Sequence, residues 1–354
     1  MSQSTPSHLF PGVPLALGSA VLFGASAPAT KLLLGAIDPW MLAGVLYLGA
    51  GIGLGVVQVI RAAIGLGRAE APLRRADLPW LAIVVLFGGV LGPLMLVFGL
   101  SLTSAASGSL LLNLEGLMTM GIAWLVFREN VDKRLLLGAT AVLAGAVVLS
   151  WQGQGASLDI GGILIAGACL AWGIDNNLTR KLSSADPVQI ATIKGLVAGA
   201  TNILLAFLLG ARFPSGGILA AGGLAGFLGI GVSLVMFMLA LRHLGAARTG
   251  AYFSLAPFIG ALLSLAIFND ALTLQLVIAG ALMAFGLWLH VAERHEHEHV
   301  HEPLEHEHAH VHDAHHQHAH DGPVAEPHSH WHRHEPVAHS HPHYPDLHHR
   351  HRHG

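Results

Sequence analysis

The sequence carries little charge. Asp, Glu, Lys and Arg make up 11% of its 354 residues, while hydrophobic residues make up 53%. Soluble domains carry about 25% charged residues. A surface with so few charges cannot be solvated, which excludes an ordinary soluble enzyme. The formal net charge is −3 and no basic patch is present, so a nucleic-acid partner is excluded too.

Cysteine and catalytic motifs are also scarce. Cys169 is the only cysteine, which excludes a disulfide scaffold and a multi-cysteine metal site. No glycine-rich phosphate loop with Lys and Ser/Thr is present, so nothing in the sequence supports ATP-driven pumping. No catalytic constellation appears either. We therefore expect no enzymatic activity and no tightly bound cofactor.

Histidine is nearly absent before residue 295, where only His8, His243 and His290 occur, but 23 histidines follow. This shift divides the chain into an N-terminal segment, 1–11, a hydrophobic region, and a His-rich tail, 293–354. The hydrophobic region predicts an all-α integral membrane protein, because open sheet edges are not viable in lipid. The lipid bilayer is then its first partner.

Ten hydrophobic runs have the length of about 20 residues that is needed to cross a membrane. Their small residues, as in Gly222-Gly-Leu-Ala-Gly226, are typical of close helix packing in lipid. The predicted spans are Gly12–Leu34, Trp40–Ile60, Leu78–Leu100, Ala105–Phe127, Leu135–Trp151, Ile160–Thr179, Val188–Leu209, Gly217–Leu241, Thr249–Phe268 and Leu272–Ala292.

Lysine and arginine in the short loops predict the orientation. With a cytoplasmic N-terminus, eleven of them fall in inner loops and two, Lys31 and Arg212, fall at the outer side. Positive residues accumulate on the cytoplasmic side. An even number of spans then places both termini in the cytoplasm, in a bacterial inner (plasma) membrane.

The chain contains an internal repeat. Gly145 and Gly286, which lie 141 residues apart, are equivalent, as are Glu129 and Asp270. A second match aligns Phe23-Gly24…Thr30-Lys31 with Trp172-Gly173…Thr179-Arg180. Each half, 12–151 and 160–292, holds five spans, so the halves have opposite orientation. Inverted repeats are typical of secondary transporters whose site lies between the halves.

These motifs resemble the EamA type of the drug/metabolite transporter superfamily. The pattern of small residues, Leu-x-Pro, a short-chain acid and a later glycine occurs as Gly245-Ala-Ala-Arg-Thr-Gly…Leu255-Ala-Pro257…Asp270…Gly286. The first copy is Ser104-Ala-Ala-Ser-Gly…Leu114-Glu-Gly116…Glu129…Gly145. Gly116 departs from the usual proline. The resemblance covers about residues 12–292 and implies a ten-helix permease, without naming a substrate.

Several polar residues lie inside the predicted spans, where a charge costs about 2.5–3.5 kcal/mol at a helix centre. Glu115 and Asp175 could accept a cation or a proton, with the neighbouring amides as neutral ligands. In the alternative interpretation, Asp175 and Lys194 form a structural ion pair and the amides join helices. The predicted pathway residues are Glu115, Asn113, Asp175, Asn176, Asn177 and Lys194.

The tail has too little apolar surface to offset the entropy of ordering, so we expect it to be disordered. Imidazole suits zinc, nickel and Cu(II), and His-rich tracts are typical of metal binding. We expect the tail to bind zinc, nickel or cobalt. A pH-responsive tail and a passive reservoir are alternatives. The predicted metal ligands are His295, His297, His299, His301, His306, His308, His310, His312, His315, His316, His318, His320, His328, His330, His332, His334, His339, His341 and His343.

Three hypotheses about function follow. The preferred one is a transporter that exports a divalent transition-metal ion, with the tail collecting or sensing metal. The second is an exporter of a small organic metabolite with a regulatory or metal-storing tail. The third is a membrane-anchored metal buffer without transport. The sequence leaves the oligomeric state open, including a homodimer.

Overall fold

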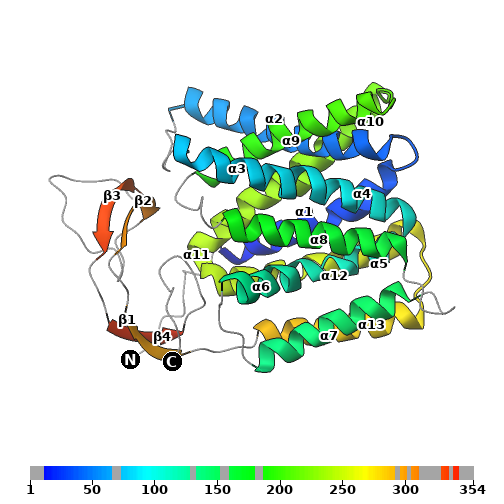
Figure 1. Cartoon of the computed structure of the whole chain (residues 1–354). Helices are drawn as coiled ribbons and strands as arrows, with labels where there is room; N and C mark the ends of the chain where they lie inside the picture. Colours follow the sequence, from blue (N-terminus) through cyan, green and yellow to red (C-terminus); the bar gives the residue numbers. More distant parts are fainter. Residues whose placement is uncertain are drawn as a thin grey trace.

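The computed structural model describes residues 12–65, 73–127, 133–151, 159–179, 186–291, 296–300, 304–310, 328–334 and 338–342. Its main body is a bundle of helices that lie roughly along one direction (Figure 1). Within these ranges, eight helical segments are long and apolar enough to cross a membrane, and Leu274–His290 is a shorter apolar helix. The predicted total of ten crossings stays a prediction.

The first half of the bundle corresponds to the first five predicted spans. The third span is one continuous helical run whose middle is a π-helix, and the fourth is interrupted at Leu112–Asn113. The elements are α1 (Gly12–Leu33), α2 (Pro39–Ala63), η2 (Arg75–Asp77), α3 (Leu78–Val84), η3 (Val85–Leu91), α4 (Gly92–Leu102), α5 (Ala105–Leu111), α6 (Leu114–Phe127) and α7 (Lys133–Ser150).

The second half repeats this plan, including a π-helix in its third span. The elements are α8 (Ile160–Thr179), α9 (Pro187–Leu208), α10 (Gly216–Gly226), η5 (Phe227–Val232), α11 (Ser233–Phe253), α12 (Ala256–Phe268) and α13 (Leu274–Val291). The loop expected at 242–248 is absent, because α11 continues through it. Ala246 and Ala247 favour helix there, and the break falls at Ser254–Leu255 instead.

Equivalent helices of the two halves pack against each other in opposite directions. Gly44 of α2 contacts Ile203 of α9, whereas Gly51, further along α2, contacts Gly195. In the same way, Gly138 of α7 contacts Gly286 of α13, and Gly145 contacts Ala279. A shift of 141 residues takes Gly138 to Ala279 and Gly145 to Gly286, so it turns each of the last two contacts into the other. The packing therefore has the symmetry of an inverted repeat.

Glycine is what lets these helices approach so closely. A Cβ atom on Gly51 would lie 2.5 Å from the backbone nitrogen of Leu196, and one on Gly286 would lie 2.5 Å from the carbonyl oxygen of Gly138. Small residues at helix contacts are the usual means of association in lipid. Many of the described glycines are thus located at helix crossings.

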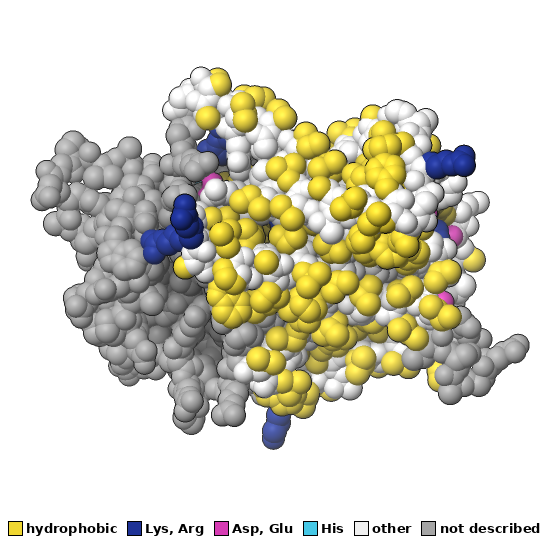
Figure 2. All heavy atoms as spheres, turned by 45° about the horizontal axis from the view of Figure 1, so that its top comes forward, with side chains coloured by type: hydrophobic (Ala, Val, Ile, Leu, Met, Phe, Trp, Pro, Cys, Tyr) yellow, Lys and Arg dark blue, Asp and Glu magenta, His cyan; other side chains and the backbone are white. Residues whose placement is uncertain are grey.

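The outward surface is apolar. In Figure 2 hydrophobic side chains cover the visible face of the bundle, while Lys and Arg side chains lie at its margins. Exposed residues such as Leu125, Leu262 and Leu208 are 72%, 67% and 74% accessible. Such a surface requires lipid around it.

Part of the His-rich tail forms strands, where the sequence predicts disorder. Strand β1 (Glu296–Val300) pairs antiparallel with β4 (Ala338–Pro342), and β2 (Leu304–His310) pairs antiparallel with β3 (His328–His334). The physical reason is that histidine at every second position matches the two-residue period of a strand. The predicted ligands His295, His301, His312, His315, His316, His318, His320 and His343 lie outside the described residues.

Candidate functional site

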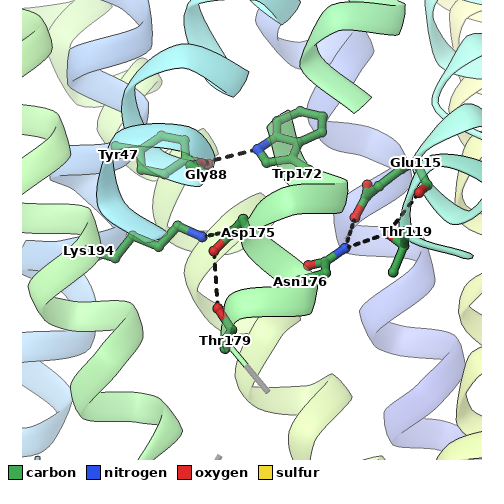
Figure 3. A network of polar contacts seen from close by, with 9 residues as sticks. All are labelled: Tyr47, Gly88, Glu115, Thr119, Trp172, Asp175, Asn176, Thr179 and Lys194. Atoms are coloured by element: carbon green, nitrogen blue, oxygen red, sulfur yellow. Dashed lines mark hydrogen bonds and ion pairs between the residues drawn. The ribbon is translucent and has the colours of Figure 1, made fainter. Parts of the chain in front are cut away.

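The candidate site is a set of polar contacts between α6, α8, α9 and η3 (Figure 3). It forms because the polar run Asp175-Asn176-Asn177 lies on three successive positions of α8. Successive residues of a helix point about 100° apart. The three side chains therefore reach different neighbours, and each makes a different kind of contact.

Asp175 points toward α9 and forms an ion pair with Lys194. The Asp175 side chain is 6% accessible and that of Lys194 is 19% accessible. Thr179 donates a hydrogen bond to the same carboxylate at 3.1 Å. A Cβ atom on Gly88 of η3 would clash with the carboxylate of Asp175. This pair is thus enclosed by three elements, and its two charges neutralise each other.

The π-helix η3 presents a carbonyl group to the same region. The hydroxyl of Tyr47 and the indole nitrogen of Trp172 both donate to the carbonyl oxygen of Gly88, at 2.7 and 3.1 Å. Asn202 donates to the next carbonyl, that of Gly89, at 3.2 Å. A π-helix leaves carbonyl groups out of the regular α-helical pattern. Side chains from α2, α8 and α9 satisfy them here.

Asn176 points toward α6. Its amide nitrogen donates to Glu115 Oε1 at 3.0 Å and to the Thr119 hydroxyl oxygen at 3.2 Å. Among the contacts of the described residues, Glu115 has no Lys or Arg within ion-pair distance. Among the described residues, no side chain of opposite charge therefore pairs with its carboxyl group, in contrast to Asp175.

Asn176 is exposed although it lies on the inner face of α8. It follows Cys169 by two helical turns and Ile165 by about three, and both of these side chains are fully buried. The lipid-facing side of α8 is marked instead by Ile163 and Leu170, which are 52% and 44% accessible. The exposure of Asn176 is therefore toward the interior of the bundle.

The remaining predicted residues have structural contacts. Asn177 donates to the carbonyl oxygens of Thr119 and Gly173, at 2.9 and 2.8 Å, and so joins α8 to α6. Asn113 donates to the carbonyl oxygen of Leu110 at 2.8 Å and lies near the sulfur of Met283. The structure thus places Asn113 away from the Glu115 and Asp175 contacts.

Sequence reasoning did not select Tyr47, Gly88, Thr119, Trp172 or Thr179. Only two signals in the sequence could have suggested them. Thr119 and Thr179 each lie four residues after a selected acid, one helical turn away. The contacts of Tyr47 and Trp172 with Gly88 depend on the π-helix, which no local pattern predicts.

No metal site is formed in the helical part of the chain that the structure describes, since no three His, Cys, Asp or Glu side chains come together there. In the tail, the backbone register of the strands places histidines opposite one another. The register places His306 opposite His332 and His308 opposite His330. In the outer pair of strands, His297 lies opposite His341 and His299 opposite His339.

The model of the EamA-like transporter family matches residues 10–151 and 159–292, once in each half. The chain belongs to the EamA-like transporter family. The resemblance inferred from the motifs is confirmed, and a multi-pass membrane transporter with two repeats follows from it.

Individual relatives agree. An uncharacterized transporter of Methanothermobacter thermautotrophicus is 29% identical over 286 residues, which are 77% of this chain and 83% of that protein. The uncharacterized transporter YyaM of Bacillus subtilis is 24% identical over 237 residues, 62% of this chain and 77% of its own. Both relatives carry the description of transporter.

A crystal structure of another protein has the same fold. Its TM-score is 0.58 at 20% sequence identity, over 79% of this chain and 95% of the other. At this identity the likeness shows the fold alone.

Proposed function

We propose that the chain is a secondary transporter that exports a small polar organic solute from the cytoplasm of a bacterium, with Glu115 and Asn176 in the solute pathway. The observation that carries the proposal is the exposure of Asn176 on the inner face of α8, hydrogen-bonded to the half-buried Glu115. A polar, accessible surface inside a membrane bundle marks a pathway for a polar solute.

The packing of the helices places Glu115 and Asn176 between the two halves. α5 packs closely against α12 of the other half. Among the described helices, α6, which continues from α5, packs mainly against α8 instead. Both partners belong to the second half, so the two halves meet along α5 and α6, and Asn176 of α8 stays accessible beside α6. An arrangement of this kind suits alternating access between inverted repeats.

The geometry favours an organic solute over the metal ion that the sequence led us to prefer. A divalent metal needs several ligands from the protein. The α6–α8 surface supplies one carboxylate, because Lys194 already neutralises Asp175. Amides and hydroxyls such as those of Asn176 and Thr119 suit the polar groups of an organic molecule.

Metal export is the second candidate, and the tail favours it. The register sets histidine opposite histidine, as at His306 and His332, and imidazole is a common ligand of zinc and nickel. In this version of the function, the tail would deliver metal to the pathway from the cytoplasmic side.

The test is transport by purified protein in proteoliposomes. Counterflow of a metabolite extract from the host cell is compared with uptake of zinc, nickel and cobalt, for the full chain, for a chain ending at residue 294, and for Glu115→Gln. Saturable flux of an organic solute that survives truncation and is lost in Glu115→Gln supports the first function. Metal flux that requires the tail supports the second, and the absence of any flux contradicts both.

A further inference from the structure

The two acids of the candidate site differ in their neighbours, and this difference constrains the charge of the solute. Asp175 is neutralised by Lys194. Glu115 has an amide and a hydroxyl nearby, but no cation within ion-pair distance among the contacts described. With Glu115 ionised, the described side chains of Glu115, Thr119 and Asn176 together carry one net negative charge.

The free hydrogen-bonding groups of this surface are acceptors, which also favours a cation. Both donors of the Asn176 amide group are used, by Glu115 Oε1 and by the Thr119 oxygen. The Thr119 hydroxyl itself donates to the carbonyl oxygen of Glu115 at 2.9 Å. No described contact uses Glu115 Oε2 or the amide oxygen of Asn176. The surface thus offers acceptors and has no spare donor among these side chains.

We propose that this surface binds a monovalent organic cation that carries N–H donors, such as a primary ammonium group, between Glu115 Oε2 and the amide oxygen of Asn176. The proposal rests on the proposed function, because it assigns the charge and the donor pattern of that solute. An ammonium group satisfies both acceptors with charge-assisted hydrogen bonds. A quaternary ammonium ion has no N–H group and would gain only the charge interaction.

Other ligand classes fit this surface less well. Among the described residues, a carboxylate or phosphate would face Glu115 without a free cation in ion-pair contact, since Lys194 is held by Asp175. A divalent metal would find a single carboxylate where it takes several ligands. The N–H donors, and not only the positive charge, are therefore the expected determinant of selectivity.

Binding is tested with the full-length protein in lipid nanodiscs, by calorimetry with n-butylammonium as the probe. Tetramethylammonium, butanoate and zinc are the comparison ligands. We expect n-butylammonium to bind more tightly than tetramethylammonium, and butanoate to show no binding. Zinc that binds the full chain and no longer binds a chain ending at residue 294 belongs to the tail. Binding of butanoate, or equal affinity for both ammonium ions, would overturn the proposal.

Three variants locate the site. Glu115→Gln keeps the shape of the side chain and removes its charge, so we expect it to weaken n-butylammonium binding about 10- to 100-fold. Asn176→Ala is expected to weaken binding less, by about tenfold. Asn113→Ala is the matched control, because it removes an amide from the same α5–α6 region that contacts Leu110 and Met283 instead. Unchanged affinity in Glu115→Gln would contradict the proposal.

The outcome is separable from that of the transport experiment. Flux of a neutral or anionic solute without ammonium binding leaves the proposed function in place and refutes this inference. Ammonium binding without flux of any solute supports the inference and refutes the proposed function. Thermal unfolding of each variant in the same nanodiscs shows whether a loss of binding reflects a loss of fold.

Discussion

The two halves of the bundle have the same plan and different chemistry at one corresponding place. Each contains a π-helix in its third span, η3 in the first half and η5 in the second, and Gly88 and Gly229 are 141 residues apart in them. Gly88 packs against the charged pair Asp175 and Lys194, whereas Gly229 packs against Ser26 of α1.

The carbonyl groups of the two π-helices are satisfied in different ways. The Gly88 carbonyl accepts from Tyr47 and Trp172, which belong to other helices. The Gly229 carbonyl accepts from Ser233, within its own helical run, at 2.6 Å. Internal symmetry thus preserves the backbone irregularity, while the polar neighbours that make a site are confined to one copy. The backbone geometry is the same in both halves, whereas the polar side chains of the candidate site surround only η3.

Removing the charge of Asp175, which lies beside η3, should have the largest effect on this difference. Asp175→Ala leaves Lys194 buried without its counter-charge, and breaking such a pair costs about 3–5 kcal/mol. We expect a marked fall in the apparent Tm in detergent and in the yield of folded protein. Ser26→Ala, at the corresponding position of α1, should change either measurement little.

The double variant Asp175→Leu with Lys194→Met separates charge from packing. Replacing a buried pair by apolar residues is often neutral or stabilising, so we expect the apparent Tm to recover. A single variant Asp175→Ala as stable as the original protein would show that the pair has no structural role.

Adding a methyl group to each π-helix comes next. Gly88→Ala would place a Cβ atom against Asp175 and Lys194, whereas Gly229→Ala would place it 2.8 Å from the Cβ atom of Ser26. Overpacking costs about 1–3 kcal/mol. Because the first clash involves the ends of two charged side chains, we expect Gly88→Ala to reduce the transport rate more than Gly229→Ala at equal expression. A larger loss of transport rate in Gly229→Ala would show that the packing of η5 against α1 limits transport more than the packing of η3 against the charged pair.

Removing the aromatic donors should have a smaller effect. Trp172→Phe gives α8 the residue type that α1 has at the corresponding position, Phe23, and removes one of two hydrogen bonds to Gly88. Such a bond contributes about 0.5–1.5 kcal/mol. The double variant with Tyr47→Phe leaves the carbonyl without either donor. In a double-mutant cycle of thermal unfolding, we expect this variant to lose more free energy of unfolding than the two single variants lose in sum. Strict additivity would contradict a shared acceptor.

The smallest change is expected from Ser233→Ala, which removes the local hydrogen bond to Gly229. The donor and the acceptor lie in the same helical run, so the bond fixes no second helix. We expect a loss of about 0.5 kcal/mol or less, measured by urea or thermal unfolding. A loss as large as that of Trp172→Phe would mean that the two π-helices depend equally on side chains.

Much of the fold follows from the sequence because lipid imposes strong, local requirements. Runs of about 20 apolar residues must be helical, and the match between Gly145 and Gly286 predicts two related halves. The contacts of these glycines confirm the register of the repeat. The break before the ninth predicted span was expected at 242–248, but it lies at Ser254–Leu255. The basic residues at 242–248 suggest a loop, whereas Ala246 and Ala247 favour the helix that the structure has there.

The candidate site follows from the sequence only in part. Its charged residues are visible because each is costly in a membrane helix. Composition and spacing cannot say which acid is paired with a cation, since this depends on how far each helix is rotated about its axis. Only the tertiary structure places Lys194 against Asp175, turns Asn113 away, and brings Asn176 to Glu115. Hydrophobicity alone decides that the chain enters the membrane, whereas the packing of glycine surfaces decides which polar side chains meet inside it.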